Sequence, residues 1–290
     1  MSTQIPRFDF DPASPLSAGM RARWAADGLL VVRDFLAPEA CARLRAQAAA
    51  WRARLAPDSP RVAFETDAQS HAQSDHFATS GGAVRLFVED DDPSQPNKLG
   101  HAMHDLDPVF SAAARDPRLE ALCAGLGMAD PRLVQSMYIF KPPGAGGAVG
   151  VHQDAAFLRT SPPTVVGFWM ALHDADRDNG CLWALPGQHT EAGPRARFGY
   201  DGGSLALDTL DARPWDMAGA VPLEVSAGTL VVLSGLLPHF SHPNRSARPR
   251  EAMTVHVVDG AAAWLPANWL RRAAPFEGFQ YSPVPTRGTT

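Results

Sequence analysis

The pattern of hydrophobic positions changes near residue 132. Before it, apolar residues recur at helical spacing over 15–27 and, after Pro38, up to residue 55, with a short apolar run at 29–32 between them. Helical spacing returns over 101–126, broken before Pro108 and Pro117, because the residue preceding a proline disfavours helix. After residue 132 the pattern predicts short strands bounded by Gly, Pro and Asn, at 133–141, 151–156, 165–172, 181–185, 223–225, 229–233 and 253–258.

Many short strands without intervening helices predict a mainly β fold, a sandwich or closed antiparallel barrel. A jelly roll is the variant with a concave interior, and the N-terminal helices would buttress one of its sheets. We find no internal repeat and no low-complexity linker, so 1–290 is expected to be one domain. Its expected parts are an arm (1–14), a helical buttress and lid (15–131), a jelly-roll core (132–260) and a C-terminal extension (261–290). The polar stretch 56–100 is the candidate lid, because long loops in compact proteins are usually functional.

Composition and charge exclude several classes of partner. The net charge is -5 without a Lys/Arg cluster, which argues against nucleic acid binding, and the acidic run 89–92 is expected to be a solvated loop. No apolar run reaches membrane-spanning length, and the N-terminus lacks the features of a secretory signal. Three widely spaced cysteines without a C-x-x-C pattern favour reduced thiols and a cytoplasmic protein. We therefore expect a small-molecule substrate, with the oligomeric state left open.

Candidate chemistry centres on His152 and Asp154. Two residues apart in a strand, these side chains would point to the same side. A second, distant histidine would complete the two-histidine, one-carboxylate triad of non-haem Fe(II) oxygenases. His239 and His242 are both candidates, and we favour His239 because it directly follows an apolar run, whereas His242 precedes a proline. Further along, Arg250 opens a β-like run and could pair bidentately with a carboxylate, although a surface ion pair is the ordinary role of an arginine.

These residues belong to a longer set of motifs. The chain resembles the phytanoyl-CoA dioxygenase (PhyH) family of Fe(II)/2-oxoglutarate oxygenases, especially its phytanoyl-CoA dioxygenase domain-containing branch, from about residue 20 to residue 270. The matching segments, in consistent order and spacing, are 27–28 (DG), 97–102 (NKLGHA), 107–110 (DPVF), 135–141 (QSMYIFK), 152–155 (HQDA), 178–183 (DNGCLW), 186–189 (PGQH), and His239, Ser241, Asn244, Ser246 and Arg250.

The resemblance implies a cupin-like double-stranded β-helix and a catalytic set. His152, Asp154 and His239 would hold Fe(2+), and Arg250 and Ser241 would hold the distal carboxylate of 2-oxoglutarate. Lys98, Met137 and Trp169 match positions that line the cosubstrate pocket, although Met137 and Trp169 could equally be core residues. O2 is the second cosubstrate, and a small organic molecule would be hydroxylated with release of succinate and CO2. Asp154 favours hydroxylation, because halogenases of this chemistry lack the carboxylate.

The remaining histidines are expected to play structural roles. His189 fits the turn motif of the family and is expected to cap a strand end, while structural or surface roles are expected for His71, His76, His101, His104, His173 and His256. Two alternative functions stay open. These are a non-oxidative cupin-like metalloenzyme, which would not need Arg250, and a catalytically silent 2-oxoglutarate-binding module. Phytanoyl-CoA itself is not implied, because no basic cluster marks a site for coenzyme A phosphates.

Overall fold

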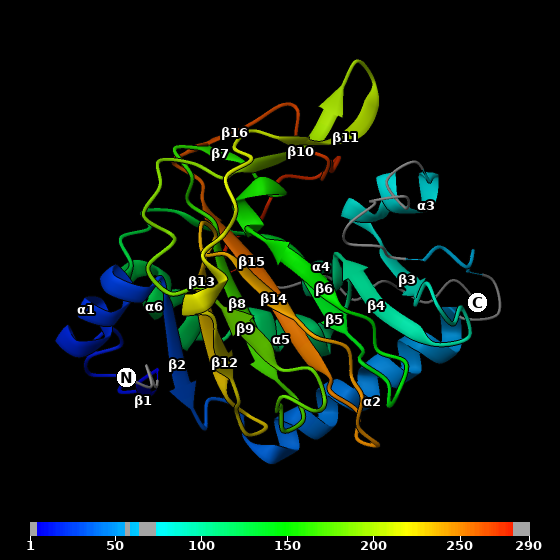
Figure 1. Ribbon diagram of the computed structural model, residues 1–290, viewed down its shortest axis with the longest axis horizontal. Helices are drawn as coiled ribbons and strands as arrows, with labels where there is room; N and C mark the ends of the chain where they lie inside the picture. The colour runs from blue at the N-terminus through cyan, green and yellow to red at the C-terminus, as the bar shows by residue number, and fades with distance from the viewer. Residues whose placement is uncertain (1–4, 56–58, 64–73, 281–290) are drawn as a thin grey trace.

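Two facing β-sheets form the centre of the molecule (Figure 1). The computed structural model describes residues 5–55, 59–63 and 74–280. Within these residues the major sheet has eight strands in the order β1-β2-β13-β8-β15-β5-β4-β3, which span Arg7–Asp9, Leu29–Arg33, Leu230–Ser234, Val166–Ala171, Ala252–Asp259, Pro131–Ile139, Pro96–His101 and Val84–Val88. The minor sheet has the order β12-β9-β14-β6, spanning Val221–Leu223, Leu182–Ala184, His239–Ser241 and Val149–His152.

Smaller elements complete the fold. Two further strand pairs are β10–β11 (Ala196–Asp201 and Ser204–Thr209) and β16–β7 (Ala263–Trp264 and Thr160–Ser161). The α-helices are α1 to α6, at Ala18–Asp27, Pro38–Leu55, Asp75–Ala78, Met103–Leu106, Pro108–Ala114 and Pro117–Gly125. Three 3₁₀ turns, η2 to η4, span Ser80–Gly82, Asp154–Ala156 and Met217–Gly219. No helix among the described residues is both long and apolar enough to cross a bilayer.

Local sequence explains where the helices begin and end. Asp107 and Asp116 cap α5 and α6 by accepting backbone N–H bonds, and the proline that follows each occupies the first helical position. The expected breaks in 101–126 are therefore the observed helix boundaries. Helix α1 ends at Gly28, which adopts a left-handed conformation with φ of 75°.

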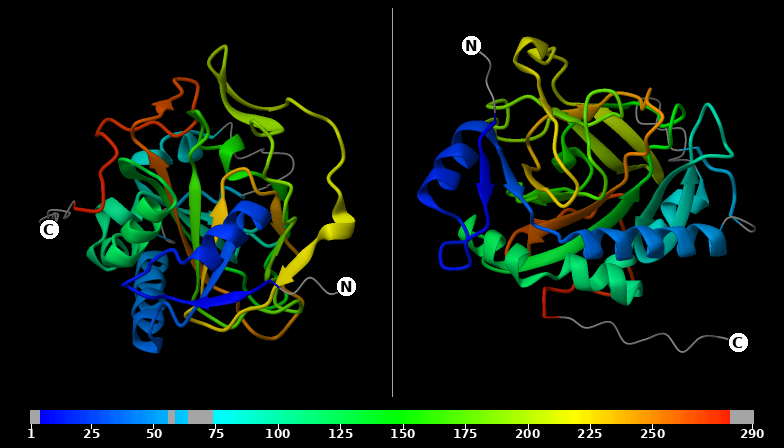
Figure 2. Two further views of the ribbon diagram at one scale, coloured as in Figure 1. Left: turned by 90° about the vertical axis from the view of Figure 1, so that its left-hand side faces the viewer. Right: turned by 90° about the horizontal axis from the view of Figure 1, so that it is seen from below.

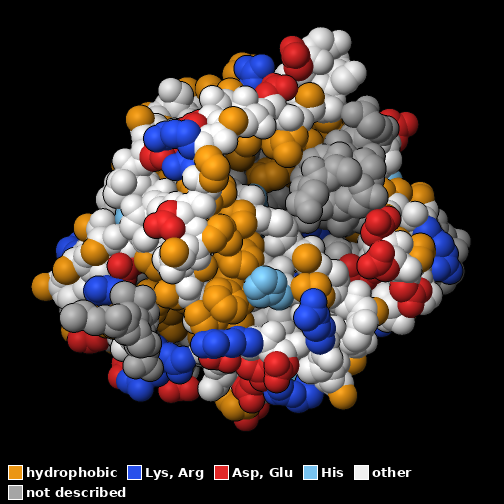
Figure 3. All heavy atoms as spheres, in the orientation of Figure 1, with side chains coloured by type: hydrophobic (Ala, Val, Ile, Leu, Met, Phe, Trp, Pro, Cys, Tyr) orange, Lys and Arg blue, Asp and Glu red, His pale blue; other side chains and the backbone are white. Residues whose placement is uncertain are grey.

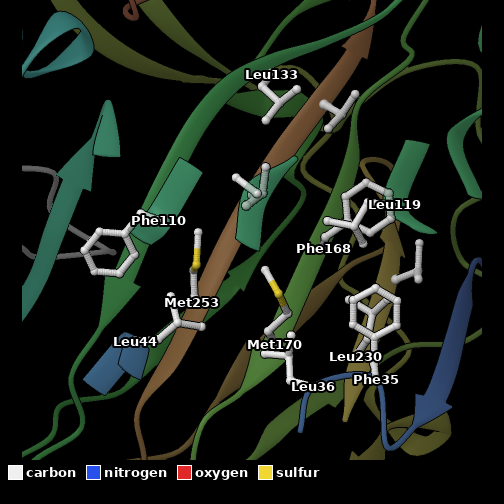
Figure 4. Packing of buried hydrophobic residues seen from close by; sticks show 14 of the residues in the cluster. Phe35, Leu36, Leu44, Phe110, Leu119, Leu133, Phe168, Met170, Leu230 and Met253 are labelled. Atoms are coloured by element: carbon white, nitrogen blue, oxygen red, sulfur yellow. The ribbon is translucent and has the colours of Figure 1, made fainter. Parts of the chain in front are cut away.

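Alternation along the central strands divides the interior into two parts. In β8, Phe168 and Met170 face the helices, where they pack with Leu44 of α2 and Phe110 of α5 (Figure 4). The intervening Trp169 points the other way, toward the minor sheet. The helices thus cover one face of the major sheet (Figure 2). The other face is directed toward the minor sheet, and the space between the two sheets is available for a site. This confirms the predicted jelly-roll core buttressed by N-terminal helices.

Several expected elements differ in the structure. Part of the expected arm is β1, which pairs in parallel with β2 at the sheet edge. The expected lid contains β3 and β4, which extend the major sheet beyond β5; its residues 56–58 and 64–73 lie outside the described chain. The hairpin β10–β11 was not predicted: β11 lacks a clear alternation of apolar and polar types, although the alternation in β10 and the Asp201-Gly202 turn could have indicated it. The strand expected at 151–156 ends at His152, and Asp154 begins η3.

Candidate metal and cosubstrate site

A cavity of about 440 Å³ lies between the two sheets and is lined by both. Strands β6 and β14 are antiparallel neighbours in the minor sheet, and their register places His239 opposite His152. The two imidazole ring centroids are 4.3 Å apart. Asp154 is the first residue of η3, and its Oδ1 lies 3.7 Å from Nε2 of each histidine. The structure therefore brings together three side chains that the sequence singled out, with their ligand atoms within 4.8 Å of one another.

Backbone contacts orient both imidazoles toward a shared point. Nδ1 of His152 lies 2.9 Å from the carbonyl oxygen of Gly150, and Nδ1 of His239 lies 3.0 Å from that of Leu237. A carbonyl can only accept, so each Nδ1 carries the proton and donates it. Each Nε2 is thereby left with a lone pair directed at Asp154, the arrangement typical of histidines that bind metals.

Charge states in this cluster suit a divalent cation. Burial and the neighbouring His239 lower the pKa of His152 to about 4, so its imidazole is neutral at physiological pH. Burial opposes ionisation of Asp154, but the nearby imidazoles of His256, His239 and His152 outweigh it and hold the pKa of this carboxyl below its usual range. Two imidazoles and one carboxylate are a donor set that binds Fe(II) and leaves coordination positions open.

His256 is a site residue that sequence reasoning missed. It was expected to be structural, yet its Nε2 lies 3.3 Å from Oδ2 of Asp154, the oxygen that does not face His152 and His239. Gly167 pairs with His256 on the neighbouring strand, and a Cβ there would lie 3.0 Å from Oδ2 of Asp154, so the glycine leaves room for this contact. Alternation in β15 could have shown that His256 faces inward with Thr254, but not which residue it would meet.

The close approach of Nε2 of His256 to Oδ2 of Asp154, at ion-pair distance, restrains how the carboxylate is turned. We expect His256→Leu to weaken binding of Co(II), measured by titration of its visible absorption, by about 10- to 100-fold, as for other outer-sphere partners of metal ligands. His256→Gln retains a hydrogen-bond donor, so its Co(II) affinity should fall by less than that of His256→Leu. His76 is also buried but bonds to the carbonyl of Leu86 instead, so His76→Leu is the matched control. Wild-type Co(II) affinity in His256→Leu would contradict this positioning role.

Arg250 lies in the same cavity with capacity to bind an anion. Its side chain is 1% exposed, and Nε donates to the carbonyl oxygen of Gly180 at 3.0 Å. Nη1 has no hydrogen-bond partner among the described residues, and neither do the buried Nε1 of Trp169 and Oγ1 of Thr254, which line the cavity as well. Burial lowers the pKa of Arg250 only to about 10, so the guanidinium is charged at neutral pH. A buried cation with an unsatisfied donor fits a carboxylate ligand.

The other expected cosubstrate residues also line the cavity. Ser241 follows His239 on β14, Met137 and Trp169 come from β5 and β8, and Lys98 comes from β4. Met137 and Trp169 are therefore not confined to the hydrophobic core, which was the alternative. Burial lowers the pKa of Lys98 to about 7, opposed by the nearby carboxylate of Glu89.

Glu89 contradicts the expectation of a solvated acidic loop at 89–92. It is 4% exposed, lines the cavity, and accepts bonds through Oε2 from the Asn97 side chain and the backbone N–H of Gly147. Lys141, also buried, donates to the carbonyl oxygens of Gly147 and His242. A Cβ at Gly147 would lie 2.9 Å from Oε2 of Glu89, so the glycine permits this close approach. Charge patterning alone missed the burial because only one residue of the run points inward.

The remaining described histidines do not join the Asp154 cluster, although His101 lines the same cavity. The alternative ligand, His242, is exposed and contacts the rings of Trp183 and Phe240. His189 does not line the cavity and lies against Gly28, at the end of α1. His101 lines the cavity, with its Nδ1 2.8 Å from Oγ of Ser80. His71 lies outside the described residues.

The jelly-roll fold and its inward-facing donors define a metalloprotein with a two-histidine, one-carboxylate site inside a double-stranded β-helix. The chain belongs to the phytanoyl-CoA dioxygenase (PhyH) family, whose model matches residues 24–252. It is 38% identical over 276 residues to phytanoyl-CoA dioxygenase domain-containing protein 1 of Bos taurus, covering 88% of this chain and 95% of that protein. It is 37% identical over 284 residues to phytanoyl-CoA dioxygenase 1 of Oryza sativa subsp. japonica, covering 91% and 97%.

Solved structures show the same fold. The epimerase SnoN in complex with Fe3+, alpha ketoglutarate and nogalamycin RO matches with a TM-score of 0.66 and 19% identity, covering 96% of this chain and 98% of that one. EctD from S. alaskensis with bound Fe matches with a TM-score of 0.66 and 18% identity, covering 96% and 91%. The family model and the two relatives confirm the family resemblance drawn from the sequence, and the solved structures confirm the fold.

Proposed function

We propose that this protein is an Fe(II)- and 2-oxoglutarate-dependent dioxygenase that hydroxylates a small organic molecule and releases succinate and CO2. One observation carries the proposal: the three metal-ligating side chains and the buried, partly unpaired guanidinium of Arg250 line a single cavity. Family membership supports the same activity. Iron(II) and 2-oxoglutarate, when bound with O2, supply the oxidising power to hydroxylate a C–H bond while the oxo acid is decarboxylated.

The protein contributes binding, orientation and exclusion of water. His152, Asp154 and His239 would hold the iron, with the imidazoles oriented by backbone carbonyls and the carboxylate by His256. Arg250 would bind the distal carboxylate of 2-oxoglutarate, assisted by Ser241. Because Arg250 is almost fully buried, its attraction for this carboxylate is little weakened by solvent. These fixed contacts would place the keto acid end of the cosubstrate at the metal.

A direct test uses purified protein stripped of metal with a chelator. Without oxygen, adding Fe(II) and then 2-oxoglutarate should produce the metal-to-ligand charge-transfer absorption of the chelated oxo acid. With oxygen, succinate should form only when both Fe(II) and 2-oxoglutarate are present. Zn(II) in place of Fe(II) is the control for metal binding without redox chemistry. A charge-transfer band without succinate would indicate a silent binding module, and neither signal would indicate a non-oxidative metalloprotein.

We also propose that the protein is cytoplasmic. Its substrate is a small molecule, and it does not bind nucleic acid. All three cysteines, Cys41, Cys123 and Cys181, are free and buried, which suits a reducing compartment. The net charge of -5 is unfavourable for a nucleic acid backbone.

A further inference from the structure

The part of the cavity next to the metal ligands has a hydrophobic wall. The ring of Phe157 stands edge-on to His152, with centroids 6.0 Å apart. Leu207 of β11 and Trp215, which follows the hairpin, line the same cavity. A molecule that brings a carbon atom to the metal would therefore contact apolar side chains there.

Hydrogen bonds connect this wall to the segment that carries two of the proposed metal ligands. Gln153, which lies between His152 and Asp154, accepts a hydrogen bond at 2.8 Å from the backbone N–H of Arg195, the residue before β10. Its amide nitrogen donates to the carbonyl oxygen of Leu236 at 2.7 Å. Gln153 is 3% exposed, so these bonds are shielded from water. The hairpin β10–β11 is thus positioned by the same segment that carries two of the ligands.

Few cations of the cavity are left for an anionic substrate, because Arg250 is assigned to 2-oxoglutarate and Lys141 donates to two backbone carbonyl oxygens. The described residues that line the cavity include four Lys or Arg side chains, and three of them (Lys98, Lys141 and Arg250) interact electrostatically with Glu89. The fourth, Arg195, bonds through Nε and Nη2 to Glu191 and through Nη1 to the carbonyl oxygen of Arg213. Its guanidinium also lies 3.7 Å from the centre of the Trp215 ring. Arg195 is therefore already neutralised and serves to hold Trp215.

The segment 207–217, which contributes Leu207, Asp211 and Trp215 to the lining of the cavity, has exposed hydrophobic and acidic side chains. Of the four large hydrophobic side chains that are exposed in the described chain, Leu207, Leu210 and Met217 lie in 207–217, at 40%, 56% and 45% exposure. Figure 3 shows hydrophobic side chains gathered below the hairpin. Residues 207–217 carry three Asp and one Arg, and this arginine, Arg213, is paired with Asp211. Phosphate groups would be repelled by the excess of carboxylates in this segment, whereas an apolar molecule would cover its exposed hydrophobic surface.

We infer that the substrate of the proposed oxygenase is an uncharged, largely hydrophobic small molecule that contacts Phe157, Leu207 and Trp215, and is not a phosphate-bearing coenzyme A thioester. The inference rests on the proposed function. A cavity of about 440 Å³ lies toward the lower end of the roughly 300–1,000 Å³ range of ligand pockets, and 2-oxoglutarate would occupy part of it. The space that remains suits a molecule of one or two rings, or a short chain.

The test compares two probes that share a naphthalene ring and differ by a phosphate group, 2-naphthol and 2-naphthyl phosphate, by calorimetric titration of protein loaded with Co(II) and 2-oxoglutarate. Binding of 2-oxoglutarate is measured first, in the same protein. We expect 2-naphthol to bind at least tenfold more tightly than its phosphate ester. Leu207→Gln should weaken 2-naphthol binding several-fold. Leu106→Gln is the matched control, because Leu106 is equally exposed and does not line the cavity.

The outcomes distinguish failure of the proposed function from failure of the inference about the substrate. Failure of 2-oxoglutarate to bind would refute the proposed function itself. If 2-oxoglutarate binds, this inference is overturned by any of three results: no 2-naphthol binding, equal or tighter binding of the phosphate ester, or equal effects of Leu207→Gln and Leu106→Gln.

Discussion

Replacing Asp154 by alanine should reduce 2-oxoglutarate turnover below detection and weaken metal binding by more than about 100-fold, beyond the range for outer-sphere residues. Asp154 is the carboxylate of the proposed triad, and its Oδ1 is directed at Nε2 of both histidines. Its loss removes the negative charge that offsets the cation and leaves two neutral imidazoles as ligands. Succinate formation and Co(II) titration measure the two effects separately.

The control for this variant is Asp9→Ala. Asp9 lies on β1, is largely exposed and pairs with Arg33 on the surface, a contact of small energetic value. Asp9→Ala should therefore match the wild-type protein in both measurements. Unimpaired turnover in Asp154→Ala, in a protein with an unchanged melting temperature, would refute the assignment of Asp154 as a ligand.

Replacing Arg250 by methionine should raise the KM for 2-oxoglutarate by about 30- to 4,000-fold. This range corresponds to the roughly 2–5 kcal/mol lost when one partner of a buried charge pair is truncated, at about 1.4 kcal/mol per tenfold change. The large effect is expected because Arg250 is 1% exposed and its Nη1 has no partner among the described residues. Arg250→Lys keeps the charge but not the planar guanidinium, so its KM for 2-oxoglutarate should lie between those of the wild-type protein and Arg250→Met.

Arg248 provides a matched control two residues away. Its side chain is mostly exposed and pairs with Asp176, so Arg248→Met should leave the KM for 2-oxoglutarate close to the wild-type value. Co(II) affinity should change little in Arg250→Met, since Arg250 is not among the metal ligands. A KM for 2-oxoglutarate that is the same in Arg250→Met and Arg248→Met would show that the cosubstrate carboxylate binds elsewhere.

Local sequence patterns predicted the features of the fold that depend on neighbours along the chain. The Asp-Pro pairs at Asp107 and Asp116 were predicted to interrupt the helical stretch 101–126, and α5 and α6 do begin there, because capping and the conformation of proline act within one turn. The strand ending at His152 was extended wrongly to residue 156. Asp154 reaches the histidines from a 3₁₀ turn, so strand alternation was the wrong reason for placing the two side chains together.

The sequence by itself determined the class of fold, the helices before residue 132, most of the strands after it, and the family motifs that contain the proposed ligands. Only the tertiary structure decided that His256 meets Asp154, that Glu89 is buried beside the cavity, and that the β10–β11 hairpin forms a hydrophobic wall. Periodicity reports which way a side chain points relative to its own strand. The partner it meets there, about 100 residues away for His256, is set by strand pairing and by the packing of one sheet against the other.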